Sequence, residues 1–398
     1  MTLTIFLSIF LTSLAWSQAF KVLPKGVRII GMRNVITSKI NSNFNQFKSE
    51  SPMGTQFKID AQTINSLSGN VITPGKDISS DAYNNFLLGE YKVDAEAQLN
   101  VRGMGFGYGL TDKLMFYGEI AYYEAQVRSS IKRTQGNSYE STARLLDGRN
   151  QAVADNLRQM IDANENTVQS VIVNHYGYKP IGDWYGKGYG DMETGLMYKA
   201  LDRGVYGLMV YPGVVLPTGR QDDPDILQDI AFGDGQFDLF TELATGYVVD
   251  DHLQFGATIR YTHQFETTKK LRIPDSQDFA LSSRTGTFNV KYGDKLNLML
   301  NSTYKFNDWI SFTPVYRYMR QESAQYHSDF HQADSFLSAN SDKEEHQGQM
   351  TASISSITPF LKKQFVLPAQ ININYVKTLS GKNIPNVQRF EFEIRMLF

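Results

Sequence analysis

Nine ionisable residues stand at alternate positions of segments whose intervening residues are largely apolar. They are Glu119, Glu193, Lys199, Glu242, Arg260, Arg317, Glu391, Glu393 and Arg395. Side chains alternate across a β-strand, and a charge that faces lipid is costly, so these nine should point into a polar interior. Both signs occur, which leaves two interpretations: charge pairs that hold a barrel wall together, or a polar path that selects solutes.

Other reactive groups give weaker signals. The chain has no cysteine, which excludes disulfides, thiolate metal sites and cysteine nucleophiles. The histidines are His175, His252, His263, His327, His331 and His346. His263 falls near the end of an alternating segment, but no serine pattern of a barrel hydrolase accompanies it. We therefore expect no catalytic residue, no cofactor and no metal site.

One connecting segment is strongly acidic. Its carboxylates belong to Asp222, Asp223, Asp225, Asp229, Asp234 and Asp238. Carboxylate oxygens could bind a divalent cation, but their spacing matches no recognised calcium-binding loop. Solvated charge is the preferred interpretation of this segment.

The last segment of the chain has the clearest alternation. Phe390, Phe392, Ile394, Met396 and Phe398 occupy one parity, and Glu391, Glu393 and Arg395 occupy the other. A strand of this kind can face lipid on one side and water on the other. A terminal aromatic residue that closes such a strand resembles the signature read by the outer-membrane barrel assembly machinery. Similar alternation recurs at residues 253–262, 296–306 and 367–375.

The spacing of turns predicts a barrel. Short turns at residues 110–113, 201–204, 249–252, 306–309 and 359–364 each join two alternating runs. With a first strand at residues 26–38 and the terminal strand, about twelve strands result. The longer connections, residues 39–92, 133–186, 219–237, 266–294 and 321–345, together with 380–386, fall on the opposite side. The sequence thus predicts an all-β, antiparallel, up-and-down transmembrane barrel in the bacterial outer membrane, in contact with its lipid.

Composition and the start of the chain agree with export. Mean hydropathy is −0.33, the sequence pI is about 6.3 and the net charge is −2, so the chain lacks the basic surface that nucleic acid attracts. Residues 5–16 are apolar and Ser17-Gln18-Ala19 forms a small-x-small site, which favours a cleaved signal peptide at residues 1–19. A retained anchor and a buried strand are the alternatives. Residues 20–398 would then form a single barrel domain.

One long connection has helical periodicity. Between residues 142 and 176, apolar residues recur at spacings near 3.6, among them Val153, Leu157, Met160 and Ile161, and Gly177 ends the run. We expect one amphipathic helix here. It could cap or enter the lumen, stand as an exposed extracellular hairpin, or lie on the membrane surface.

Two stretches resemble a known family. The hairpin at residues 108–113 (YGLTDK) looks like one found in several outer-membrane barrels, and a longer match runs from residue 188 to 265. Its motif residues are Gly190, Asp191, Leu216, Pro217, Thr218, Gly219, Gly233 and Gly235. This order resembles the outer-membrane transporters linked to the phenol meta-degradation pathway, which are similar to the long-chain fatty-acid transporters. The N-terminal plug motif of the latter is not found after Phe20.

The resemblance implies a channel or transporter for passive uptake of small hydrophobic or aromatic compounds, with a small apolar solute as its partner. Physically, Pro217 lacks a ladder donor and Gly219 permits a bend, so the LPTG run should end a strand where the chain leaves the membrane. The tyrosine-rich run at residues 176–189 favours contact with planar apolar groups. A structural or adhesive surface protein is the alternative function, and a rim-located hydrolase is a further one.

Overall fold

The computed structural model of the chain describes residues 22–67, 79–277 and 281–398. The expected signal peptide at residues 1–19 lies outside the described residues. The chain divides into two compact units. One contains the described residues up to Ser51, Glu96–Val127 and Trp184–Phe398, and the other contains Pro52–Ala95 and Arg128–Asp183. That residues 20–398 form a single barrel domain stays a prediction.

The first unit is a closed antiparallel barrel of twelve strands. Its strands are β1 (Arg28–Thr37), β5 (Leu87–Thr111), β6 (Leu114–Gln135), β8 (Met192–Asp202), β9 (Tyr206–Leu216), β10 (Asp238–Val248), β11 (Leu253–Gln264), β14 (Lys295–Lys305), β15 (Ile310–Gln321), β17 (Lys343–Ser355), β18 (Ala369–Lys382) and β20 (Gln388–Leu397). Each strand pairs with its neighbours in chain order, and β1 closes the ring between β5 and β20. The predicted fold class and strand number are confirmed.

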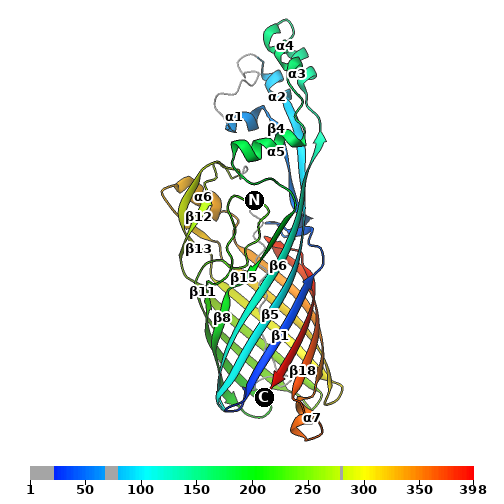
Figure 1. Cartoon of the computed structure of the whole chain (residues 1–398), viewed down its shortest axis with the longest axis vertical. Helices are drawn as coiled ribbons and strands as arrows, with labels where there is room; N and C mark the ends of the chain where they lie inside the picture. Colours follow the sequence, from blue (N-terminus) through cyan, green and yellow to red (C-terminus); the bar gives the residue numbers. More distant parts are fainter. Residues whose placement is uncertain (1–21, 68–78, 278–280) are drawn as a thin grey trace. The chain divides into compact units, whose positions relative to one another are not determined.

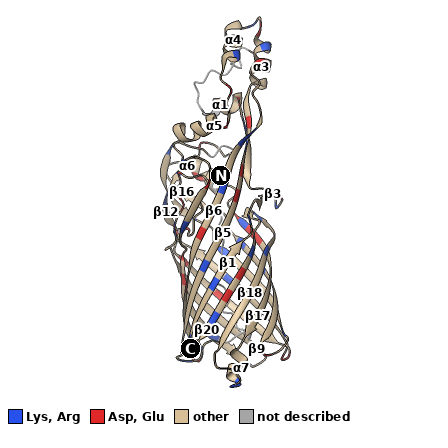
Figure 2. Cartoon of the chain, turned by 45° about the vertical axis from the view of Figure 1, so that its right-hand side comes forward, with Lys and Arg blue, Asp and Glu red and all other residues tan. Residues whose placement is uncertain are grey.

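The two faces of the barrel wall differ as the alternation predicted. In β20, Phe390, Phe392, Met396 and the following Phe398 are exposed and Ile394 is half-buried, whereas Glu391, Glu393 and Arg395 are buried. Exposed Tyr189, Phe237, Tyr261, Phe265, Tyr304, Phe306 and Phe312 extend this apolar and aromatic exterior around the wall. Charged positions are spread along the barrel strands (Figure 2). A closed sheet that is apolar outside and polar inside spans the outer membrane, because every backbone group is paired and the exterior suits lipid.

Four of the five predicted turns are confirmed, at the β5–β6, β8–β9, β10–β11 and β14–β15 connections. The fifth prediction, a tight turn at residues 359–364, is wrong. The chain leaves β17 at Ser355, forms the short helix α7 (Ile357–Leu361) and enters β18 only at Ala369. Pro359 fits this helix, since it lies in the first turn, where no backbone donor is needed. The C-terminus and α7 lie at the same end of the barrel, opposite β12, β13 and α6 (Figure 1).

The long connections of the barrel unit contain further elements. They are β2 (Ser42–Phe44), β3 (Glu50–Pro52), β7 (Trp184–Tyr189), β12 (Thr267–Arg272), β13 (Thr285–Lys291), β16 (Gln325–His327), α6 (His331–Ser338) and β19 (Ile384–Pro385). Strands β12, β13 and β16 form a small sheet, and α6 packs on it through a core that includes Phe288, Val290 and Ala333. The connections that contain β12, β13, β16 and α6 are therefore folded around a small core of their own.

The second unit holds β4 (Gly54–Asp60), which pairs with the part of β5 that belongs to this unit, and a group of short helices. The helices are α1 (Ala61–Leu67), α2 (Ser80–Asn85), α3 (Tyr139–Leu146), α4 (Gln151–Gln159), α5 (Glu165–Ser170) and the π-helical turn η1 (Val171–His175). Buried Phe86, Tyr139, Leu146 and Leu157 form their core. In the described ranges, no helix is long and apolar enough to cross a membrane.

The predicted single helix at residues 142–176 is wrong. Gly148 takes a positive φ of 74° and ends α3, and the cap residue Asn150 then starts α4 by accepting from the Val153 backbone N–H. Met160 and Ile161 follow α4 as exposed residues and share no apolar face with Leu157. The 3.6-residue periodicity found the helical content, but local caps divided it into four pieces. Gly177, with φ 72°, ends the run as predicted.

Candidate functional site

A cluster of five charged residues lines the inner face where the barrel closes. This terminal cluster consists of Arg33 from β1 and Arg389, Glu391, Glu393 and Arg395 from β20, all buried. The Glu393 carboxylate accepts from Arg33 Nη2 at 3.2 Å and from Arg395 Nε at 2.9 Å. Glu391 accepts from Arg389 Nε at 2.7 Å and lies 3.8 Å from Arg33 Nη1. Each carboxylate thus has two cationic neighbours.

Amide side chains of β18 complete this cluster. Asn372 donates to Glu393 at 2.9 Å and Asn374 donates to Glu391 at 3.3 Å. Buried carboxylates are stable only when their oxygens are paired and hydrogen-bonded, and both conditions are met here. The terminal cluster therefore ties β1, β18 and β20 together from inside.

A second ion pair crosses the inner face between strands that are not neighbours. Both Nη atoms of Arg260 in β11 bond to the carboxylate of Glu193 in β8, at 3.1 and 2.7 Å. The Tyr117 hydroxyl donates to the same carboxylate at 2.9 Å, and the Arg260 guanidinium lies 3.5 Å from the centre of the Phe240 ring. Because β9 and β10 separate the two strands, this pair can form only across the inner surface.

Of two further residues expected in the interior, only Glu119 lies near these groups. Glu119 is half-buried in β6, opposite Glu193 in register, and lines a small pocket with Arg33, Tyr117 and Glu393. Lys199 takes no part in either cluster. It lies near the β8–β9 turn, where its Nζ atom is 3.3 Å from Asp202.

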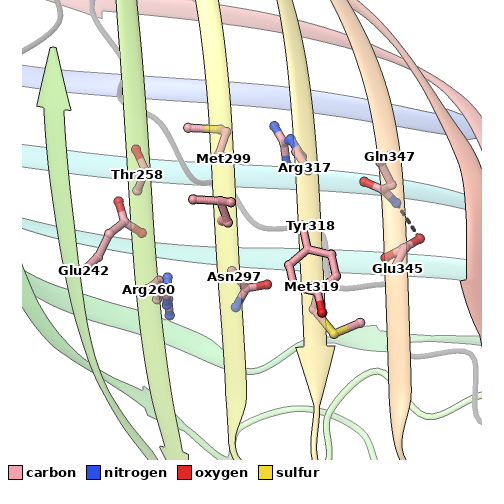
Figure 3. Close-up of a pocket in the computed structure, with 11 residues that line it drawn as sticks. Glu242, Thr258, Arg260, Asn297, Met299, Arg317, Tyr318, Met319, Glu345 and Gln347 are labelled. Atoms are coloured by element: carbon pink, nitrogen blue, oxygen red, sulfur yellow. Dashed lines mark hydrogen bonds between the residues drawn. The ribbon is translucent and has the colours of Figure 1, made fainter.

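The remaining two expected residues, Glu242 and Arg317, line a larger pocket with Arg260. This lumen pocket is formed by Glu242 of β10, Thr258 and Arg260 of β11, Asn297, Leu298 and Met299 of β14, Arg317, Tyr318 and Met319 of β15, and Glu345 and Gln347 of β17. Figure 3 shows these side chains on five adjacent strands, with Glu242 on the first strand of the row and Arg317 on the fourth. The pocket offers carboxylate, guanidinium, amide and thioether groups on one stretch of wall.

The family-motif residues meet at the start of the connection between β9 and β10, called here the mouth loop (residues 217–237). Leu216 ends β9 and Pro217 follows it outside the strand. Thr218 Oγ1 donates to the Gly190 carbonyl at 3.1 Å and accepts from the Met192 N–H at 3.0 Å. The LPTG run thus ends a strand and fastens its loop to the β7–β8 junction.

Asp191 anchors both halves of the mouth loop. Its carboxylate accepts from the Gly219 N–H at 2.8 Å and from the Asp234 N–H at 3.0 Å. A Cβ at Gly233 would collide with this carboxylate, and Gly235 has a positive φ of 72°, so both glycines are required by the backbone path. Burial and the nearby Asp234 carboxylate raise the pKa of Asp191 to about 6, although the two N–H donors act to lower it.

The interpretation of the acidic segment as solvated charge is wrong. Residues 228–236 are all buried, and among the segment's carboxylates Asp229, Asp234 and Asp238 are buried with them. Asp229 accepts from Nη1 of Arg220 at 2.9 Å and from Nη2 at 2.7 Å. Asp234 accepts from Gln264 Nε2 at 2.9 Å. These carboxylates fold the mouth loop inward because each has a specific donor.

The mouth loop contacts barrel strands on both sides of its own hairpin. The Phe232 ring stacks on Tyr123 of β6, with ring centres 5.1 Å apart. On the other side, Gln236 Nε2 donates to the Val290 carbonyl of β13 at 2.6 Å, and Asp234 lies 3.8 Å from Lys295 of β14. The loop therefore covers part of the outer end of the barrel instead of extending into solvent.

An apolar cluster also faces inward. It contains Ile29, Met115, Tyr117, Met197, Met209 and Phe240 from the barrel strands, with Val22 and Leu23 packed among them. The buried Val22 and Leu23 precede β1, so the start of the described chain contributes to this lining although no plug motif was recognised there. The inner wall is thus polar in some regions and apolar in others.

The histidines show no catalytic grouping. His263 Nδ1 lies 2.9 Å from Asp294 Oδ2, and the Tyr261 hydroxyl donates to the same oxygen at 2.5 Å. Partial burial would raise the pKa of Asp294, but these hydrogen bonds lower it to about 2. In the part of the chain that the structure describes, no group of three His, Cys, Asp or Glu residues is placed to hold a metal ion. That the chain is not an enzyme stays a prediction.

The nine residues expected in the interior are all charged, so its uncharged contributors are not among them. Asn297, Asn372 and Asn374 stand at the polar positions of their strands, and this parity was the available signal. Tyr117 and Phe240 carried no such signal, because aromatic residues suit either face of the wall. The apolar run Ile230, Ala231 and Phe232 was a partial indication that the mouth loop folds inward.

No protein-family model matches the chain, and no curated protein matches it. Among solved structures, an outer membrane channel from Pseudomonas putida F1 is similar over 95% of this chain and 98% of its own, with 13% identity and a TM-score of 0.55. The fold is shared with that channel. A Pseudomonas aeruginosa FadL homologue (8% identity, 94% and 90% covered, TM-score 0.36) and the Pseudomonas putida toluene transporter TodX (11%, 94% and 89%, 0.31) are more distant.

Proposed function

We propose that the chain is an outer-membrane channel that lets small solutes with an apolar or aromatic body enter the cell by diffusion. The observation that carries this proposal is the inner wall, which combines the polar lumen pocket with the inward apolar cluster. A solute with an apolar body finds surface to contact along such a wall, whereas a purely aqueous pore would be lined by polar groups throughout. The resemblance at residues 188–265 supports the same solute class.

In this proposal the mouth loop limits the size of the entering solute. Twelve strands enclose less space than the 16 strands of open porins, so one loop folded against the wall removes a large part of the opening. The bidentate Arg220–Asp229 pair and the Phe232–Tyr123 stack hold the loop in that position. Loosening either contact should widen the opening without disturbing the barrel.

The test is conductance and solute permeation through the refolded protein in planar bilayers and liposomes. We expect small single-channel conductance and saturable permeation of phenol, and we expect Arg220→Ala to raise conductance severalfold. Arg203→Ala, in the exposed β8–β9 turn, is the matched control and should change nothing. Absence of both conductance and phenol permeation from the wild type and from Arg220→Ala would contradict the channel proposal.

A further inference from the structure

Three groups that line the lumen pocket are without partners in the described part of the chain. Arg317 Nε is buried and makes no hydrogen bond, and no ion pair involves this guanidinium. The Nδ2 atom of Asn297 is also buried without a hydrogen bond. The Glu242 carboxylate lies in the same pocket with no hydrogen bond or ion pair to any described residue. Buried polar atoms such as Arg317 Nε and Asn297 Nδ2 are seldom left in this state, because each loses its hydration.

The charged neighbours of these groups are already engaged. Arg260, which is opposite Glu242 in register, uses both Nη atoms on Glu193. Glu345 accepts from Gln347 at 2.6 Å and from Thr378 at 3.1 Å. The Nη atoms of Arg260 therefore cannot pair with Glu242 without giving up Glu193, and Glu345 makes its two contacts through Oε1 with uncharged groups and not with Arg317.

The sheet register fixes how the three groups are arranged. One row across the strands reads Glu242, Arg260, Asn297, Met319 and Glu345. The next row on the same face reads Ala244, Thr258, Met299, Arg317 and Gln347. Asn297 and Arg317 are thus diagonal neighbours on adjacent strands, within roughly 7 to 8 Å between Cα atoms.

Glu242 lies at the other end of this arrangement. It is three strands from Arg317, which corresponds to roughly 14 Å between the backbones at strand spacing. Met299 and Met319 stand between or beside these polar ends and offer polarisable apolar contact. Figure 3 shows Met299 beside Arg317, with Glu242 at the opposite side of the pocket.

We propose that the lumen pocket binds a small aromatic acid that carries a hydroxyl group at the end opposite its carboxylate. The carboxylate accepts from Arg317 and Asn297, the ring lies on Met299 and Met319, and the distal hydroxyl donates to Glu242. Arg is suited to this role because its planar fork pairs with a carboxylate through two parallel hydrogen bonds. This inference rests on the proposed channel function and specifies the solutes that the channel prefers.

Other solute classes fit these groups less well. A hydrocarbon leaves the Arg317 guanidinium and the Asn297 amide without acceptors, so binding it removes water from them without compensation. An inorganic anion satisfies Arg317 but gains no contact with the methionines. A hydroxylated aromatic acid satisfies all three unpartnered groups at once.

The test measures block of ion current by added solute, with 4-hydroxybenzoate, benzoate and phenol as probes. In the wild type, 4-hydroxybenzoate should block at the lowest concentration, benzoate at a several-fold higher one, and phenol weakest. Arg317→Gln should raise the half-blocking concentration of both acids about tenfold and leave phenol unchanged. The matched control is Arg320→Gln on the same strand, whose exposed side chain faces away from the pocket and should not alter block.

Glu242→Gln separates the two ends of the site. It should abolish most of the preference for 4-hydroxybenzoate over benzoate and leave block by benzoate unchanged. Equal block by all three probes in a conducting wild-type channel, or unchanged block in Arg317→Gln, would overturn the aromatic-acid site while the channel function stands. Absence of conductance and of phenol permeation would instead remove the proposed function itself.

Discussion

Two parts of the inner wall contain glutamate and arginine, but only one of them joins these side chains in ion pairs with each other. In the terminal cluster, Glu391 and Glu393 are each contacted by two arginines and an asparagine. In the lumen pocket, Glu242 and Arg317 line one cavity without an ion pair to any described residue. Both regions contain glutamate and arginine, so they differ in whether these side chains form ion pairs with each other and not in the residue types.

We propose that the two interpretations of the interior charges, wall pairing and solute selection, apply to different regions. The terminal cluster joins β1, β18 and β20 where the first and last strands meet, so its pairs contribute to closing the barrel. The lumen pocket leaves donors and an acceptor available to a solute. A paired charge indicates a structural role and an unpaired one indicates a binding role, which the following substitutions test.

The largest effect should come from the outer face of the terminal strand. We propose that Phe398, with the exposed aromatic residues of β20, is the signal for the barrel assembly machinery. Phe398→Asp should remove most of the folded, heat-modifiable protein from outer membranes. Phe360→Asp, at an exposed aromatic residue of α7, is the control and should assemble normally. Normal assembly of Phe398→Asp would show that the signal lies elsewhere.

The inner face of the same strand should affect stability. Glu393→Gln removes the charge that pairs with Arg33 and Arg395, whose side chains are 5% and 6% exposed. Removing this charge from between two buried guanidinium groups should cost about 3 to 5 kcal/mol, even though Arg33 keeps Glu391 at 3.8 Å. The measurement is the free energy of unfolding of the refolded protein in a urea titration. A loss below about 1 kcal/mol would mean that the terminal cluster does not hold the barrel closed.

Ile259 and Arg260 compare the two faces of one strand. Ile259 is 45% exposed on the outside, whereas Arg260 is 3% exposed and paired with Glu193. Ile259→Arg should cost about 2 to 4 kcal/mol, because it places a charge in lipid near the middle of the strand. Arg260→Ala should change both conductance and stability, since it leaves the half-buried Glu193 with only the Tyr117 hydroxyl. An Ile259→Arg variant as stable as the wild type would contradict the register.

The sequence supported the barrel because its signal is repeated and local. Alternation in β20 and turn residues at four connections depend on neighbours in the chain, so strand number and the two faces could be predicted. The prediction of one helix at residues 142–176 was wrong, because Gly148 and Asn150 interrupt a periodicity that is otherwise continuous. Caps are local signals as well, and reading them would have divided the helix correctly.

The interior could be predicted only as a set of residue types. Parity placed Glu242, Arg317 and Glu393 on one face, but it carries no information about which strands face each other across the lumen. Pairing of Arg260 with Glu193 depends on strands that are 67 residues apart in the chain. The mouth loop was misjudged for the same reason: Asp191, which binds it, precedes the loop by a whole hairpin.

The smallest effect on stability should come from the lumen pocket, where Glu242→Gln makes the same Glu-to-Gln change as Glu393→Gln in the terminal cluster. Glu242→Gln removes the charge of a half-buried carboxylate that forms no ion pair with a described residue, so no ion pair is lost and the cost of partly burying the charge is relieved. Its free energy of unfolding should change by less than about 1 kcal/mol, toward greater stability, in the titration that is applied to Glu393→Gln. Arg317→Gln should behave alike. A loss as large as that of Glu393→Gln would show that Glu242 forms an ion pair in the membrane-embedded protein. A Glu242 carboxylate that is already paired could not accept a hydrogen bond from the hydroxyl of a solute.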